Sequence, residues 1–329
     1  MGGSQLDKRD KVAFIFPGQG SQYVGMGSDF YESFQSSKKV YDEANEVLGM
    51  DLKGICFCGT EEELRKTENT QPAILATCIA MLRALESEGI DCDYTAGLSL
   101  GEYSSLVMSK SLTFRDAIRL VKERGKFMQE AVPLGVGGMA AILGLQKEKI
   151  PAILEVTKDY GVVEVANYNS PEQIVLSGEI KGLKIACQEA IRQGAKKAIP
   201  LPVSAPFHSS LLVPAGEKLK EALSKVEVYE SKKKVVTNVD GMPILSKEEI
   251  KPKLVDQVSS SVLWQQSVEY MINDGVNTFV EVGPGKSLSG FVKRIGRALG
   301  KEVKTLNVND LSSFKDTVEY LKWKKSGDE

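Results

Sequence analysis

The sequence predicts an α/β protein whose core holds a mainly parallel sheet. Short apolar runs alternate with amphipathic helical stretches, which is the pattern of strands joined by crossover helices. Turns rich in glycine and proline end the apolar runs. The order of the expected strands and helices changes between Pro133 and about Ser204, which indicates an inserted unit. A chain of 329 residues, 42% hydrophobic and 26% charged, is long enough for two well-buried domains.

The first part of the core, residues 1–133, alternates strands with helices. In order, we expect a strand over Val12–Phe16, a helix over Phe30–Leu48, a helix to about Glu88 with Pro72 near its first turn, a strand over Asp93–Ala96, a helix from Glu102, and a helix over Thr113–Gln129.

The inserted part, residues 134–204, shows the order strand–helix–strand–strand–helix–strand, which is that of a small ferredoxin-like α+β subdomain. Its elements are expected over Met139–Leu143, Lys147–Lys158, Gly161–Asn167, Gln173–Ser177, a helix to about Gln193, and Lys196–Leu201. Residues 205–329 return to the core, with a strand near Val235–Val239, a helix around Val262–Asn273 and a strand over Thr278–Val282.

Composition excludes several classes of protein. A net charge of −2 provides no strong attraction to nucleic acid or to an anionic membrane. No apolar run reaches the roughly 18 residues of a membrane span, and Met1 to Lys11 lacks the apolar stretch of a signal peptide. The five cysteines indicate free thiols in a reducing compartment. We therefore expect a cytoplasmic protein, and a monomer, with no nucleic-acid or membrane partner.

Ser99 lies in a motif that fits a nucleophile elbow. Gly97-x-Ser99-x-Gly101 stands between an expected strand and an expected helix, as in α/β-hydrolase-like cores. The glycines allow a sharp turn, and the helix N-terminus can stabilise an oxyanion. The alternative is a glycine-rich turn with an incidental serine.

His208 is the only histidine of the chain. It follows Ser99 in chain order, as the base follows the nucleophile in the serine hydrolases, and its proline- and serine-rich surroundings favour a loop. A serine hydroxyl needs such a base to become a nucleophile. A lone histidine can equally be structural, and no acidic third member is evident among the many Asp and Glu residues.

Arg124 lies on the amphipathic stretch Thr113–Gln129. Charged residues on such a helix usually face water, and by itself Arg124 fits that description. A guanidinium can also bind a substrate carboxylate through two parallel hydrogen bonds.

Several ordered motifs together resemble the malonyl-CoA:acyl-carrier-protein transacylases, the acyltransferases of type II fatty acid synthesis. The resemblance covers about Lys11 to Val318. Its motifs are Phe16-Pro17-Gly18-Gln19-Gly20-Ser21-Gln22, Thr70-Gln71-Pro72-Ala73, Gly97–Glu102, Arg124-Gly125 with Met128, Ala166-Asn167-Tyr168-Asn169-Ser170-Pro171, Pro206-Phe207-His208-Ser209 and Glu281-Val282-Gly283-Pro284-Gly285.

This resemblance implies a role for each matching residue. Ser99 would carry the malonyl ester, and His208 would be its general base and then its general acid. Arg124 would pair with the malonyl carboxylate. The remaining substrate-binding residues would be Gln19 and Leu100, whose backbone N–H groups form the oxyanion hole, together with Met128 and Phe207.

The resemblance also explains the missing acid, because the family holds the imidazole with a backbone carbonyl. We expect that carbonyl within Ser261–Trp264. Phe207 is the type found in malonyl-selective members. Two positions depart from the family pattern: Leu98 stands where a histidine is usual, and Leu263 where a polar residue is often found.

The implied activity is ping-pong transfer of a malonyl group from malonyl-CoA to the phosphopantetheine thiol of acyl carrier protein, with no metal and no redox cofactor. Three alternatives remain. A serine thioesterase or esterase would use the same pair with water, although it would not need Arg124. An acyltransferase for another extender or a polyketide pathway would share the motifs, and a carrier-docking protein could have lost activity.

Overall fold

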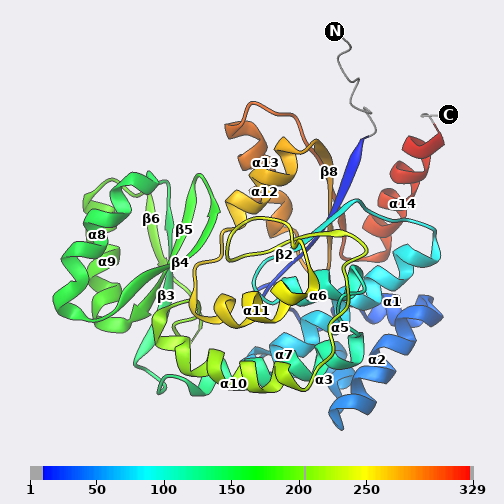
Figure 1. Cartoon of the computed structure of the whole chain (residues 1–329), viewed down its shortest axis with the longest axis horizontal. Coiled ribbons are helices and arrows are strands. Elements are labelled where there is room, and N and C mark those ends of the chain that lie inside the picture. The colour runs from blue at the N-terminus through cyan, green and yellow to red at the C-terminus, as the bar shows by residue number, and fades with distance from the viewer. Residues whose placement is uncertain (1–9, 204, 327–329) are drawn as a thin grey trace.

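The computed structural model of the protein describes residues 10–203 and 205–326 (Figure 1). Two sheets divide the described chain. The larger sheet contains β1 (Lys11–Phe16), β2 (Tyr94–Gly97), β7 (Lys234–Val236), β8 (Val276–Val282) and β9 (Lys304–Val308). The smaller sheet contains β3 (Gly137–Leu143), β4 (Val163–Ser170), β5 (Gln173–Glu179) and β6 (Lys197–Pro200). The predicted fold class, with its parallel core and smaller α+β part, is confirmed.

The larger sheet is parallel throughout, in the order β7-β2-β1-β8-β9. Both faces are buried, as parallel sheets require. Along β1, Phe14 and Phe16 join the apolar cluster on one face, while Ala13 and Ile15 join the cluster on the other. This alternation explains why the strand appears in the sequence as an uninterrupted apolar run.

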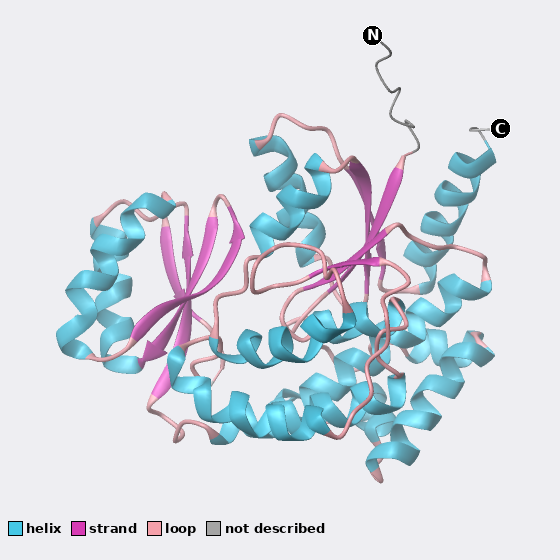
Figure 2. Ribbon diagram, viewed as in Figure 1, coloured by secondary structure: helices cyan, strands magenta, loops and turns pink. Residues whose placement is uncertain are grey.

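Helices cover both faces of the larger sheet (Figure 2). One side carries α12 (Trp264–Asn273) and α13 (Ser287–Ala298). The other helices of the core are α1 (Ser28–Ser33), α2 (Gln35–Leu48), α3 (Leu52–Cys58), α4 (Glu61–Arg65), α5 (Thr67–Ser87), α6 (Gly101–Met108), α7 (Phe114–Glu130), α10 (Val213–Ser224), α11 (Ile250–Ser259) and α14 (Leu311–Ser326).

The smaller sheet is antiparallel, in the order β4-β5-β3-β6, and two helices, α8 (Ile150–Thr157) and α9 (Ile180–Arg192), pack on one of its faces. This is the ferredoxin-like arrangement. Met139, Ala141 and Val175 on its opposite face join the main apolar cluster of the core. The domain boundaries expected at residues 133–134 and 204–205 stay predictions, and Ser204 lies outside the described residues.

A short seam of backbone hydrogen bonds joins the smaller sheet to the core. The Val262 N–H donates to the Ala166 carbonyl at 2.8 Å, and the Tyr168 N–H donates to the Val262 carbonyl at 3.0 Å. The Ser261 hydroxyl donates to the Val165 carbonyl. The segment just before α12 therefore continues the edge at β4.

Some expected elements were wrong in detail. The helix expected over Phe30–Leu48 is two helices, because Phe34 is extended between α1 and α2 and its ring packs on Phe30 and Phe314. Pro72 does not lie in a first turn: α5 begins at Thr67, and the proline is inside the helix.

The strand expected near Val235–Val239 ends at Val236 in the structure. The chain then turns at Thr237, whose hydroxyl donates to Asp240 at 2.7 Å. This early end places Asn238 outside the sheet ladder, where its side chain can reach other segments.

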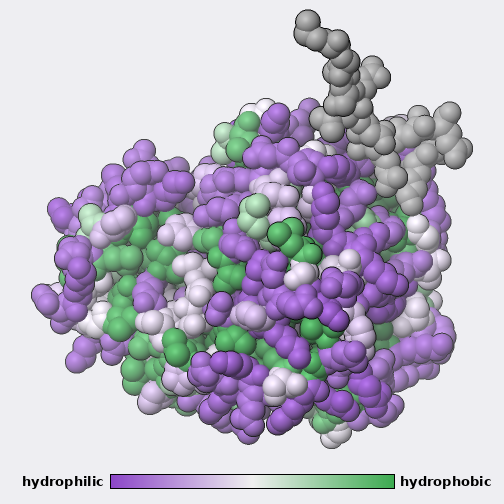
Figure 3. Space-filling model, in the orientation of Figure 1, coloured by the Kyte–Doolittle hydropathy of each residue, from purple (hydrophilic) through white to green (hydrophobic). Residues whose placement is uncertain are grey.

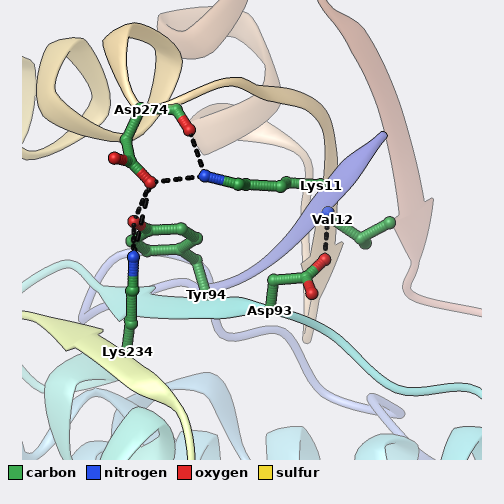
Figure 4. A network of polar contacts seen from close by, with 6 residues as sticks. All are labelled: Lys11, Val12, Asp93, Tyr94, Lys234 and Asp274. Carbon is green, nitrogen blue, oxygen red and sulfur yellow. Dashed lines mark hydrogen bonds and ion pairs between the residues drawn. The ribbon is translucent and has the colours of Figure 1, made fainter. Parts of the chain in front are cut away.

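A polar network joins the N-terminal ends of three parallel strands (Figure 4). The Lys11 ammonium group lies 2.7 Å from an Asp274 carboxylate oxygen, which also accepts from the Tyr94 hydroxyl. Lys234 donates to that hydroxyl at 2.9 Å. These groups connect β1, β2 and β7 to the turn before β8. They lie at the N-terminal ends of the strands, whereas Ser99 follows the C-terminal end of β2.

None of the described helices combines the length and the apolar character that a membrane span requires. Hydrophilic residues cover most of the face shown in Figure 3, and apolar residues gather mainly toward the smaller sheet and its junction with the core.

Candidate active site

Ser99 stands on a sharp turn between β2 and α6. Its backbone is left-handed, with a φ of 53°. A Cβ at Gly97 would lie 1.9 Å from the Gly101 carbonyl carbon, and a Cβ at Gly101 would lie 2.1 Å from the Phe16 carbonyl oxygen. Only glycine fits at these two positions, so the motif spacing follows from the tightness of the turn.

His208 meets Ser99 across 109 residues of sequence. The Ser99 Oγ and the His208 Nε2 are 2.7 Å apart. The His208 Nδ1 lies 2.8 Å from the carbonyl oxygen of Gln257. Because that carbonyl can only accept, Nδ1 carries the proton and Nε2 is free to accept the serine proton.

The electrostatics keep this imidazole neutral. His208 is buried, and its pKa is lowered from 6.5 to about 4, first by desolvation and then by the positive charge of Arg124. Two backbone carbonyls, those of Gln257 and Ser260, oppose the shift. At neutral pH the ring is therefore in the form that a general base requires.

The expectation that the carbonyl would come from Ser261–Trp264 was wrong. It belongs to Gln257, in the last turn of α11, where carbonyls have no intrahelical donor. The Ser261–Trp264 segment has other partners: Val262 joins β4, and the Leu263 N–H donates to the Asn238 carbonyl at 2.8 Å.

Arg124 faces the interior and not the solvent, and it is only 1% exposed. It lies on the buried side of α7 with Val121 and Met128. A Cβ at Gly125 would lie 2.7 Å from the Thr67 carbonyl oxygen, so this glycine allows α7 to pack closely on α5. The solvated-face interpretation is excluded by this placement.

The Arg124 guanidinium is held by neutral groups. Its Nη1 donates to Gln71 Oε1 at 2.8 Å, and its Nη2 donates to Gln257 Oε1 at 3.0 Å and to Ser99 Oγ at 3.2 Å. Within the described ranges no carboxylate forms a salt bridge with it. The site therefore holds a buried cation beside the nucleophile, with its charge available to an anionic group.

The other predicted substrate-binding residues surround this centre. Leu100 is buried and caps α6, and Gln19 follows β1 with its side chain 3.4 Å from the Thr67 hydroxyl. Met128 is buried with its sulfur 3.7 Å from Gln71 Nε2, and Phe207 is buried directly before His208. The Leu98 N–H donates to the Phe16 carbonyl at 3.0 Å, which joins the loop after β1 to the elbow. The oxyanion role of the Gln19 and Leu100 amides stays a prediction.

Sequence reasoning missed three polar residues that support the site. Asn238 clamps the elbow, because its Oδ1 accepts from the Ser99 N–H at 2.6 Å and its Nδ2 donates to the Gly97 carbonyl at 2.7 Å. Gln257 donates from Nε2 to the Ser99 carbonyl at 3.1 Å. Gln71, in the Thr70–Ala73 motif, accepts from Arg124 Nη1 at 2.8 Å. Single amides carry no sequence signal, so only the fold identifies Asn238 and Gln257.

The two departures from the family pattern leave this geometry intact. Leu98 packs against the apolar cluster that contains Trp264. Leu263 acts through its backbone, since its N–H holds Asn238 and its carbonyl accepts from Ser267.

Among the described residues, no three or more His, Cys, Asp or Glu side chains lie close enough together to hold a metal ion. All five cysteines are free thiols, as expected from the sequence.

The family model described as "Acyl transferase domain" matches residues 13–314. A malonyl CoA-acyl carrier protein transacylase of Bacillus subtilis is 47% identical over 313 residues, which cover 95% of this chain and 98% of the relative.

Solved structures of the same kind superpose closely. A malonyl CoA-acyl carrier protein transacylase from Clostridium perfringens has a TM-score of 0.92 at 47% identity, covering 96% of this chain and 98% of the other. A second structure holds a type II PKS acyl-carrier protein in complex with its malonyl-transacylase. It has a TM-score of 0.91 at 40% identity and covers 94% of this chain and 100% of that one.

Proposed function

This chain belongs to the malonyl CoA-acyl carrier protein transacylases of the acyl transferase family, and from that premise we propose how its residues transfer a malonyl group. The substrate is malonyl-CoA, and the acceptor is the phosphopantetheine thiol of an acyl carrier protein. One observation carries the proposal above all: a serine–histidine pair shares its site with a buried arginine that has no carboxylate partner in the described chain.

The first half-reaction loads the serine. The malonyl carboxylate binds Arg124, which places the thioester carbon at Ser99. The Ser99 Oγ attacks that carbon while its proton passes to His208 Nε2. The oxyanion rests on the Gln19 and Leu100 N–H groups. When the tetrahedral intermediate collapses, the C–S bond breaks and His208 returns the proton to the departing CoA thiol.

The second half-reaction reverses the chemistry with a new thiol. His208 takes the proton of the phosphopantetheine thiol, whose sulfur attacks the malonyl-Ser99 ester. The C–O bond breaks, Ser99 recovers its proton from His208, and malonyl-carrier protein leaves. No metal or redox cofactor enters either half, so we expect a chelator such as EDTA to leave the rate unchanged.

The wider setting is part of the proposal. We propose that the enzyme supplies extender units for fatty acid synthesis, that it acts as a monomer, and that it works in the cytoplasm, where a reducing environment suits five free thiols. A polyketide carrier is the alternative acceptor, because one structural relative is bound to such a carrier. Discharge rates with the two kinds of carrier protein would decide between them.

Intact-protein mass spectrometry after brief mixing with malonyl-CoA tests the central step. We expect a malonyl adduct on the wild type, no adduct on Ser99→Ala, and loss of the adduct when acyl carrier protein is added. Release of CoA without an adduct would instead indicate water as acceptor and a thioesterase. Neither adduct nor CoA release would contradict the proposed substrate.

A further inference from the structure

A buried carboxylate lies behind the arginine and is not part of the mechanism above. Glu102 is in the first turn of α6 and is only 1% exposed. Its Oε2 accepts from the Asn238 N–H at 2.9 Å and from Gln257 Nε2 at 3.0 Å. The other end of the same amide, Gln257 Oε1, accepts from Arg124 Nη2. A continuous chain thus runs from carboxylate through amide to guanidinium.

The carboxylate determines which way the amide points. An ionised carboxylate only accepts hydrogen bonds, so it attracts the NH₂ end of Gln257 and turns the oxygen toward Arg124. The Ser99 carbonyl, at 3.1 Å from the same Nε2, favours the same orientation. With the amide reversed, two donors would face each other at Arg124 and two acceptors at Glu102.

The position of the charge matters as much as the orientation. A carboxylate in direct contact with Arg124 would occupy its donors and neutralise its charge. Here two amide oxygens, from Gln71 and Gln257, hold the guanidinium, and the negative charge stands one residue further away. The arginine is fixed in place by neutral groups, and its charge remains available to a ligand.

We propose that Glu102 is a positioning residue that sets selectivity for carboxylate-bearing acyl groups, because it orients the Gln257 amide and thereby holds Arg124 without neutralising it. This inference rests on the proposed malonyl transfer. It concerns the preference of the site for malonyl over acetyl groups and not the acyl transfer itself.

The charge state of Glu102 offers an independent readout. Burial raises the pKa of Glu102 to about 7, against the lowering effects of the Asn238 N–H, the Gln257 amide, Arg124 on α7 and Lys253 on α11. Arginine stays protonated in proteins, and, against desolvation by burial, the ion pairs of Lys253 with Glu249 and Asp240 raise its pKa. Burial raises the pKa of Tyr103 to about 12, and the pKa of His208 is lowered to about 4, so neither group titrates between pH 6 and 8. We expect the malonyl:acetyl preference of the wild type to rise from pH 6 to 8 as Glu102 ionises, and to stay level in Glu102→Gln.

An exchange of carboxylate and amide tests the proposal most directly. The double variant Glu102→Gln/Gln257→Glu keeps the net charge and allows the same 102–257 hydrogen bond, but it places the carboxylate against Arg124. The measurement is kcat/KM for loading Ser99 from malonyl-CoA and from acetyl-CoA. We expect the malonyl:acetyl ratio to fall about 10- to 100-fold, the range for losing a charge-assisted hydrogen bond.

The single variant Glu102→Gln provides a second test if the double variant does not fold. Its amide can present either end to Gln257, so we expect the malonyl:acetyl ratio to fall about 3- to 10-fold at pH 8. Glu281→Gln is the matched control. Glu281 is equally buried and accepts two backbone N–H groups of α13, but it contacts neither Gln257 nor Arg124. Its ratio should equal that of the wild type.

The proposal would be overturned if Glu102→Gln lowered kcat/KM equally for malonyl and acetyl loading and kept the malonyl:acetyl ratio and its pH dependence as in the wild type. Glu102 would then have only a structural role. A wild type that shows no preference for malonyl at all would instead contradict the proposed function, so the two failures are distinguishable.

Discussion

Ser99 and His208 share a backbone conformation that most residues avoid. Both have positive φ, at 53° and 58°, and Lys110 is the one other such non-glycine residue in the described ranges. This conformation is costly for a side chain with a Cβ, so surrounding contacts must impose it. Around Ser99 the Asn238 side chain does so from both sides of the turn. In this conformation the Ser99 hydroxyl lies 2.7 Å from the His208 Nε2.

Replacing Arg124 by alanine should separate binding of the acyl carboxylate from the chemistry at Ser99. We expect kcat/KM for malonyl loading to fall about 100-fold, because a buried charge-assisted contact is lost. Loading of the neutral acetyl group should hold or rise, since it has no carboxylate to bind. Rates with both CoA esters measure the difference, and an equal loss of both would contradict the carboxylate role.

The lowered pKa of His208 predicts an unusual pH profile. The base is active when neutral, and its pKa is about 4. Acetyl loading should therefore stay level from pH 8 to about 5 and fall only as the pH approaches 4. Circular dichroism at each pH shows whether the fold persists. A midpoint near the ordinary histidine value of about 6.5 would mean that burial does not control this residue.

At the scale of elements, the turn between β2 and α6 depends on backbone packing. Gly101→Ala would force a Cβ to within 2.1 Å of the Phe16 carbonyl oxygen. We expect the free energy of unfolding to fall by about 2–4 kcal/mol and malonyl loading to fall with it.

Gly290→Ala is the matched control for that substitution. Gly290 is also helical, in α13, and its nearest neighbour would be an Arg294 Nη1 at 3.8 Å. Alanine should raise stability there by about 0.5–1 kcal/mol through helix propensity. Denaturant unfolding measures both variants. Equal effects would show that close packing at Gly101 is not what selects glycine.

The elements also show what sequence can and cannot predict. The strand β1 could be predicted because it is an uninterrupted apolar run ended by Pro17-Gly18, and the helix α7 because its buried residues recur with helical spacing. Ser99, Arg124 and His208 could be proposed because motifs surround them. Gln257 could not, because its contribution depends on a carbonyl at the end of α11 and on an amide whose partners come from three other segments.

At the scale of the whole molecule, the larger sheet separates catalysis from anchoring. The carboxyl ends of its strands carry the Ser99 elbow and the loop with Gln19, as in other open parallel sheets. The N-terminal ends of the strands carry the hydrogen-bond network around Asp274. The two regions can therefore be altered independently.

Asp274→Asn tests that separation. The pKa of Asp274 is lowered to about 2, first by Lys11 and then by the Tyr94 hydroxyl. The carboxylate thus stabilises the fold above its unfolded pKa near 4, and this contribution is lost as pH falls toward 2. At pH 7 we expect the variant to lose about 1 kcal/mol of stability with unchanged malonyl loading. The difference in Tm from the wild type should be constant from pH 5 to 8 and should shrink below 4.

The seam at Val262 bears on how this enzyme could be recombined with its relatives. The seam residue pairs with β4 and stands shortly after Gln257, whose carbonyl holds the catalytic imidazole. A chimera that imports only β3 to β6 from another transacylase would place foreign backbone against a native edge. Residues 257–263 would have to travel with the imported unit, so the smallest exchangeable module is discontinuous in sequence.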